Sequence, residues 1–141
     1  MPKKNAKSRR MDAERAAEHY VHSLGCVCSC RAVRTKWQSQ DMFASDVIGK
    51  KADGSMVFVQ ATAGQNSAVS ARRKKLERIP WAADDTVQVA QLVQTEDPAN
   101  SRRKLWFFRI HHYRHNIGWI TLPDAVSVKK EWFRAYKNKG D

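Results

Sequence analysis

Residues 45–63 read SDVIGKKADGSMVFVQATA, in which two runs rich in apolar and β-branched residues flank the tripeptide Ala-Asp-Gly at 52–54. An Asp-Gly pair between two such runs is a strong signal for a β-hairpin. We therefore predict one strand over Ser45–Lys51 and a second over Ser55–Ala63, with Gly54 in the left-handed conformation at the end of the turn.

The length of this turn determines which side chains share a face of the hairpin. A three-residue loop pairs Asp46 with Gln60, whereas a two-residue loop would place Asp46 opposite Ala61. We favour the three-residue loop because it puts the polar residues at the open end of the hairpin on one face. An acid and an amide would then lie side by side there, within reach of an acid on the first helix.

Helix and strand signals continue on both sides of the hairpin. Asp12 is a candidate N-cap, and Gly25 lies where a glycine often ends a helix. The predicted elements outside the hairpin are a helix over 13–24, strands over 26–33, 86–95, 104–113 and 119–122, a helix over 68–79 and a C-terminal helix from Pro123. This order predicts an α/β fold in which a mixed β-sheet is flanked by helices. We expect a disordered basic arm over 1–11 and a single folded domain over 12–137.

Composition narrows the class of protein. The chain has 141 residues, 42% of them hydrophobic, which suits one domain with a real core. No segment approaches the roughly 20 apolar residues of a membrane span, and no apolar stretch follows the basic N-terminus, so we expect no signal peptide. Three cysteines favour a reducing, cytoplasmic setting over a disulfide scaffold. The small, basic chain also fits a phage-encoded protein.

The net charge of +12 predicts a polyanionic partner. A membrane surface is the weaker interpretation, because no segment combines this charge with a broad apolar face. A solvated basic surface without a partner is the bland alternative. Nucleic acid is the partner that we expect.

The segment Asp12–Ala17, followed by Gly25 eleven residues after Glu14, resembles the first helix of archaeal-type Holliday junction resolvases. That family belongs to the PD-(D/E)xK nuclease superfamily, whose fold is restriction-endonuclease-like. Its chains continue with an aspartate that opens a hairpin and an E-x-K motif near the end of the next strand. Here Asp46 opens the hairpin, and Gln60–Thr62 occupies the E-x-K position.

The resemblance implies a divalent cation, Mg²⁺ or Mn²⁺, held by the side chains of Glu14, Asp46 and Gln60 and by the backbone carbonyl of Ala61. Such a cation lowers the pKa of a bound water and neutralises charge on the phosphate. Gln60 replaces the family glutamate, which removes one negative charge from the site. Thr62 replaces the family lysine, and Lys50 or a cation of the second helix is the candidate substitute. The implied catalytic set is Glu14, Asp46, Gln60 and Thr62.

Clustered basic residues are candidates for contacts with DNA phosphates, which are independent of sequence. The predicted contacts are Arg31, Arg34, Lys36, Arg72, Arg73 and Lys74. Trp37 lies between cations in a polar loop. It can anchor that loop or stack on an unpaired base, and the sequence leaves both roles open.

These observations predict a metal-dependent endonuclease that acts on branched DNA such as a four-way junction. Symmetric cleavage of a junction implies a homodimer, with Trp81, Trp119 and Trp132 as candidate surface aromatics. The rival hypothesis is a catalytically impaired DNA-binding protein with the nuclease fold, which the changes at Gln60 and Thr62 support. An RNA-binding basic protein is a third possibility.

Overall fold

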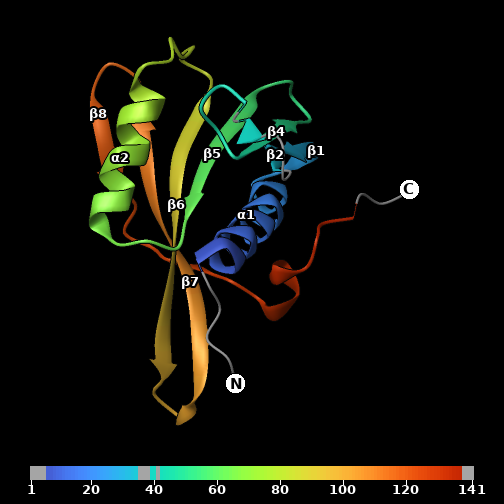
Figure 1. The fold of residues 1–141 in the computed structure, drawn as a ribbon. Coiled ribbons are helices and arrows are strands. Elements are labelled where there is room, and N and C mark those ends of the chain that lie inside the picture. Colours follow the sequence, from blue (N-terminus) through green and yellow to red (C-terminus); the bar gives the residue numbers. More distant parts are fainter. Residues whose placement is uncertain (1–5, 35–38, 41, 138–141) are drawn as a thin grey trace.

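The computed structural model describes residues 6–34, 39–40 and 42–137, which form both helices and strands (Figure 1). In chain order the elements are α1 (Ala6–Ser23), β1 (Cys26–Arg31), β2 (Val33–Arg34), β3 (Ser39–Gln40), β4 (Val47–Lys51), β5 (Met56–Thr62), α2 (Asn66–Glu77), β6 (Thr86–Asp97), β7 (Asn100–Arg114), β8 (Gly118–Thr121), β9 (Val126–Ser127) and the 3₁₀ helix η1 (Lys130–Phe133).

The hairpin of β4 and β5 has the register predicted for a three-residue loop. Val47 pairs with Val59, and the Lys51 amide donates to the Ser55 carbonyl at 2.9 Å. Gly54 has φ of 91°, a left-handed conformation that glycine adopts without steric cost. Loop length and the Asp-Gly signal were therefore sufficient to fix this part of the structure.

The main sheet has the strand order β1-β4-β5-β6-β7-β8, and β9 pairs with β7. β5 and β6 are parallel, and α2 connects them, whereas the neighbouring pairs are antiparallel. β2 and β3 form a separate two-stranded sheet. The prediction of one domain with a mixed α/β architecture is confirmed at this level.

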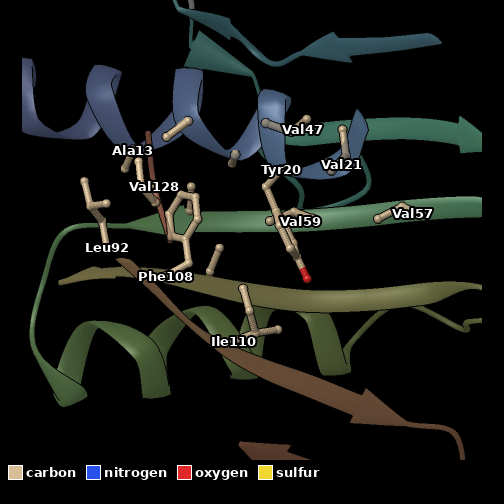
Figure 2. Packing of buried hydrophobic residues seen from close by; sticks show 14 of the residues in the cluster. Ala13, Tyr20, Val21, Val47, Val57, Val59, Leu92, Phe108, Ile110 and Val128 are labelled. Carbon is tan, nitrogen blue, oxygen red and sulfur yellow. The ribbon is translucent and has the colours of Figure 1, made fainter. Parts of the chain in front are cut away.

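Helices α1 and α2 lie on opposite sides of the sheet (Figure 1). The α1 side holds the larger apolar cluster, in which Tyr20 and Val21 of the helix pack toward the sheet residues Val59, Phe108 and Ile110 (Figure 2). Spacing of small alanines on α1 lets the helix approach the strands closely. Because several of these side chains are fully buried, the α1 face supplies much of the hydrophobic stabilisation.

The α2 side holds a second apolar cluster, with Phe58 and Val89 of the sheet against Val69 and Leu76 of the helix. Trp81 closes this cluster and donates its indole N–H to the Leu76 carbonyl at 2.7 Å. Trp81 is 9% exposed, so the prediction that it contributes to a dimer surface is wrong for this tryptophan. With both faces covered, the polar ends of the central strands are the places left for chemistry.

The N-terminal boundary differs from the prediction. The helix α1 begins at Ala6, so residues 6–11 are helical and do not belong to the disordered arm expected over 1–11. The sequence prediction treated the basic residues as an arm because they lack an apolar pattern. Here they extend a helix whose later turns pack firmly on the sheet, and tertiary packing stabilises a helix more than local propensity does.

The C-terminal helix expected from Pro123 is also absent from the described residues. Val126 pairs with Phe108 in the short strand β9, and the Val128 amide donates to the Trp106 carbonyl at 2.9 Å. Only η1 is helical in this segment, as a single 3₁₀ turn. The β-branched valines favour strand pairing, and the open edge of β7 provides the partner.

β6 and β7 extend well past their neighbours and form a two-stranded ribbon that projects from the sheet (Figure 1). The strands predicted over 86–95 and 104–113 are therefore longer than expected, since Glu96 still pairs with Lys104. Among the described residues, no helix combines the length and apolar character that crossing a membrane would require.

Candidate functional site

The candidate site lies where β5 ends and β4 begins. Asp46 immediately precedes β4, and its backbone N–H donates to the Val59 carbonyl at 2.9 Å. Gln60, Ala61 and Thr62 are the last residues of β5. The antiparallel register thus places the aspartate beside the last residues of the neighbouring strand, as the sequence predicted.

Ala61 is the point at which two charged side chains meet the backbone. Its N–H donates to Asp46 Oδ2 at 2.8 Å, and its carbonyl accepts from Arg72 Nε at 3.3 Å. The N–H and C=O of one strand residue point to the same side of the strand. The Asp46 carboxylate and the Arg72 guanidinium therefore flank the same side of β5.

Arg72 is one of the residues considered as a substitute for the family lysine. It comes from the second turn of α2, and the helix places it on the backbone of β5. Lys50 points elsewhere, because its Nζ donates to the Gly54 carbonyl at 3.1 Å in the hairpin turn. Among the described candidates, Arg72 is therefore the cation that the fold brings to the end of β5.

Gln60 and Thr62 are buried, with exposed fractions of 2% and 4%. The Gln60 amide nitrogen donates to the Ala44 carbonyl, so its remaining ligand atom is Oε1. Thr62 Oγ1 accepts the Gly64 N–H at 2.9 Å and shapes the turn that leaves β5. Neither side chain brings a charge to the site.

Glu14 approaches the site from α1. It is 1% exposed, and its Oε1 lies 3.4 Å from Arg10 Nε. A cavity of about 340 Å³ is lined by Glu14 together with Ala32, and the Ala32 amide donates to the Asp46 carbonyl at 2.7 Å. Glu14 and Asp46 thus both lie beside Ala32, one lining the cavity with it and the other accepting its N–H.

A second cavity, of about 440 Å³, adjoins Thr62 and is lined by three arginines. Arg9 and Arg10 come from the first turns of α1, and Arg72 comes from α2. Sequence reasoning missed the first two because it assigned them to a disordered arm, although their adjacency to the Glu14 helix was a usable signal. Guanidinium groups bind phosphate well, so this arginine pocket suits an anionic group beside the end of β5.

The predicted DNA contacts have different environments. Arg31 lines the Glu14 cavity and lies 3.5 Å from Glu18. Arg34 lies in β2. Lys36 and Trp37 fall outside the described residues.

On α2, Arg73 is half-buried and turns inward. Its guanidinium lies 2.7 Å from His111 Nδ1 and 5.5 Å from the Trp119 ring centroid, and its Nε is buried without a hydrogen bond. Lys74 is exposed. The Arg73 side chain is thus engaged within the fold, and the predicted phosphate contacts of Arg73 and Lys74 stay predictions.

The inward turn of Arg73 defines a polar network across the sheet. His111 Nε2 lies 3.1 Å from Gln91 Oε1, and the Gln91 amide donates to the Gly64 carbonyl. Burial, with Arg73 and Arg109 nearby, lowers the pKa of His111 to about 4. A neutral His111 accepts the Arg73 hydrogen bond at Nδ1 and donates from Nε2, so the network rigidifies the turn after β5.

The oxygen donors near the end of β5 are of the chemical types that Mg²⁺ binds while it keeps much of its water. Mg²⁺ is commonly bound through one or two carboxylates, with waters and substrate phosphates as further ligands. Asp46, Glu14, the Gln60 amide oxygen and the Ala61 carbonyl are oxygen donors of this kind. Among the described residues, no group of three or more His, Cys, Asp or Glu side chains could hold a metal. Any cation site here therefore has a low ligand charge.

Comparisons of the chain with protein-family models, with curated proteins and with solved structures give no match.

Proposed function

We propose that the protein is a metal-dependent endonuclease with a restriction-endonuclease-like fold that acts on branched DNA. The observation that carries this proposal is the meeting of a carboxylate and a guanidinium at Ala61, beside the arginine pocket. Support for the fold comes from the order helix, three antiparallel strands, helix and parallel strand over α1 to β6. This order agrees with what the resemblance implies.

In this mechanism each residue at the end of β5 has a distinct task. Asp46 and Glu14, with the Ala61 carbonyl, would hold Mg²⁺ or Mn²⁺, which supplies an acidified water and charge neutralisation when bound. Arg72 orients the scissile phosphate through its guanidinium and stabilises the negative charge that develops there. Gln60 contributes its amide oxygen, and the Thr62 hydroxyl can donate to a phosphate oxygen.

The arginine pocket positions the DNA strand next to this centre. Arg9 and Arg10 on α1 line the same cavity as Arg72 on α2, so a phosphate that enters would be contacted from two elements. Because such contacts do not read bases, selectivity for a junction would come from the shape of the DNA. A homodimer would supply two such sites for paired cuts, and light scattering of the free protein measures its mass.

The experiment compares the parent protein with Asp46→Asn on a labelled four-way junction and on a linear duplex of the same sequence. We expect junction cleavage by the parent in Mg²⁺ or Mn²⁺, none in EDTA, and none by Asp46→Asn. Binding by both proteins in EDTA should fall steeply as salt rises, because phosphate contacts release counterions. A flat salt response contradicts the nucleic-acid premise itself.

A DNA-binding protein without nuclease activity is the second candidate, and one observation favours it. The Gln60 amide is engaged with the Ala44 carbonyl, so the position of the family glutamate serves the structure of the loop before β4. Retained junction binding by parent and Asp46→Asn, with no cleavage by either, would establish this candidate. Preferential binding of RNA in competition would replace both with the RNA-binding alternative.

A further inference from the structure

A groove of about 1210 Å³ lies on a different part of the molecule from the end of β5. One wall is the start of β7, from Arg103 to Phe107, and the other is the segment from Ala125 to Phe133. In Figure 1 this segment, drawn in red, leaves β9 and passes η1 beside the base of the projecting ribbon. The groove exists because β9 covers β7 only at Phe107 and Phe108, which leaves the earlier part of that edge open.

Most of the charged side chains that line this groove are basic. Among the described residues that line it, the cations are Arg103, Lys104, Lys129 and Lys130, and the acids are Asp12 and Glu131. All four cations are exposed. Asp12 lies 3.9 Å from Arg15, which offsets part of its charge. Lys104 Nζ lies 3.4 Å from Glu96 Oε1, so the groove carries a modest net positive charge, which favours a ligand with a chain of negative charges.

Aromatic rings lie in the same groove, between the cations. Trp106 and Phe133 come from opposite walls, with ring centroids 5.5 Å apart in an edge-to-face arrangement. Phe107 lines the groove as well, and all three rings are partly exposed. Half-buried rings beside exposed cations are the combination on which unpaired bases stack while the backbone follows the positive charge.

We propose that this groove binds an unpaired strand of DNA. A duplex would meet the cations but could not present its base faces to Trp106 and Phe133, because paired bases are stacked within the helix. An acidic peptide would satisfy the charge and leave the rings without a matched partner. Single-stranded DNA uses both features, and the choice of DNA over RNA rests on the proposed function.

The position of the groove relates it to the candidate nuclease site. Asp12 lines the groove and Glu14 lines the cavity near Asp46, and residues two apart on a helix face different directions. The first turns of α1 thus separate the two surfaces, and Arg9 and Arg10 lie on those turns. A strand that leaves the site at β5 reaches the groove across one helix diameter, about 10 Å.

The test measures binding of a labelled oligo-dT of about 12 nucleotides, a length within the usual site size of such folds. The double variant Lys129→Ala with Lys130→Ala removes two cations of the groove. We expect its slope of log affinity against log salt to fall by about 1.4, since each phosphate contact contributes ~0.7. The variant Phe133→Leu keeps apolar packing and removes the ring, so its affinity should fall by roughly fivefold or more at an unchanged slope.

The matched control is Arg78→Ala with Arg114→Ala, which removes the same charge from exposed positions at the ends of α2 and β7. Its salt slope should stay at the parental value. Equal losses in both double variants, or unchanged binding by Phe133→Leu with a parental melting temperature, overturn the proposal. So does an acidic peptide that displaces oligo-dT from the groove, or tighter binding of oligo-rU.

Junction binding and cleavage are measured in parallel with the same variants. If the groove variants bind oligo-dT with the parental affinity while the protein still cleaves the junction, the groove proposal is refuted and the endonuclease proposal stands. Groove-dependent oligo-dT binding without junction cleavage supports the groove while the endonuclease proposal fails. The two proposals are therefore distinguished by one set of proteins.

Discussion

Replacing Asp46 tests both the architecture and the chemistry of the site. Asp46 is 3% exposed and Ala61 is fully buried, so the hydrogen bond from Ala61 N–H to Asp46 Oδ2 is shielded from water. The variant Asp46→Ala leaves that N–H without its acceptor. Leaving a buried donor unsatisfied costs about 1–3 kcal/mol, and the lost side chain adds to this. We expect a loss of about 2–3 kcal/mol in the free energy of unfolding.

The variant Asp46→Asn separates the acceptor from the charge. Its side-chain oxygen can still accept the Ala61 N–H, so we expect it to lose less than about 1 kcal/mol. It nevertheless removes the carboxylate that would hold the cation, and cleavage should be lost. Urea denaturation followed by tryptophan fluorescence gives the midpoint and the slope for both variants. An unchanged slope assigns a shifted midpoint to stability alone.

A total stability of about 5–15 kcal/mol for a domain of this size makes a difference of 2 kcal/mol easy to measure. If Asp46→Ala unfolds at the parental midpoint, the buried hydrogen bond to Ala61 is not part of the folded structure, and the site argument fails with it. If Asp46→Asn loses as much stability as Asp46→Ala, the negative charge rather than the acceptor is needed at this position. In that case the Arg72 guanidinium is its natural partner.

Three other buried side chains are tested by substitution or titration. Gln60→Glu loses the hydrogen bond that the Gln60 amide donates to the Ala44 carbonyl, so without metal its free energy of unfolding should fall by about 1–3 kcal/mol. Mg²⁺ should restore its melting temperature, because added ligand charge strengthens the binding of hard cations. A melting temperature that does not respond to Mg²⁺ speaks against a metal site. Burial is the main reason that the pKa of His111 is lowered from 6.5 to about 4. The unfolded chain therefore binds the proton first, and the free energy of unfolding should fall by up to about 3 kcal/mol as the pH drops from about 6.5 toward 4. An NMR titration of His111 with a midpoint near 6.5 would contradict its burial. Tyr20→Phe removes a buried 2.7 Å hydrogen bond to Gln88 Oε1, and its free energy of unfolding in urea should fall by about 1–3 kcal/mol. Burial raises the pKa of Tyr20 to about 12, so the variant should lack the tyrosine that ionises last in a spectrophotometric titration.

The hairpin of β4 and β5 was predictable because its information is local. Ala52-Asp53-Gly54 fixes the loop, and the loop fixes the pairing of Val47 with Val59. The side chains that line the open end follow from alternation alone. For this reason the sequence placed Asp46 beside the end of β5.

The termini were not predictable in the same way. Residues 6–11 carry no apolar stripe, and only the packing of later turns explains why the helix extends through them. Pro123 suits the first position of a helix, yet the open edge of β7 pairs with Val126 as a strand. A contact between residues far apart in the chain overrides local propensity in both cases.

The cation at the site shows most clearly what sequence cannot specify. Arg72, Arg73 and Lys74 are adjacent in one basic run, and nothing in that run distinguishes their roles. Successive residues on a helix point about 100° apart, so the orientation of α2 on the sheet decides which one meets β5. The helix aims Arg72 at the Ala61 carbonyl and Arg73 at His111, and it leaves Lys74 exposed.

In the proposed metal site at β5, the ligand charge would be lower, and the positive charge around it higher, than in the family pattern. Glu14 and Asp46 with two neutral oxygens would form the ligand set, and the cavity that adjoins it at Thr62 is lined by three arginines, whereas the family pattern has an additional glutamate and one lysine. A free cation gains little in such surroundings, because the nearby guanidinium groups repel it. A bound DNA phosphate reverses that balance by neutralising the arginines and offering its own oxygens to the cation. Metal and DNA should thus bind cooperatively here. Calorimetry should give a weak affinity for Mn²⁺ in the free protein and a several-fold stronger one in the complex with a junction. Equal affinity in both states would mean that the arginine pocket and the carboxylates do not share a ligand.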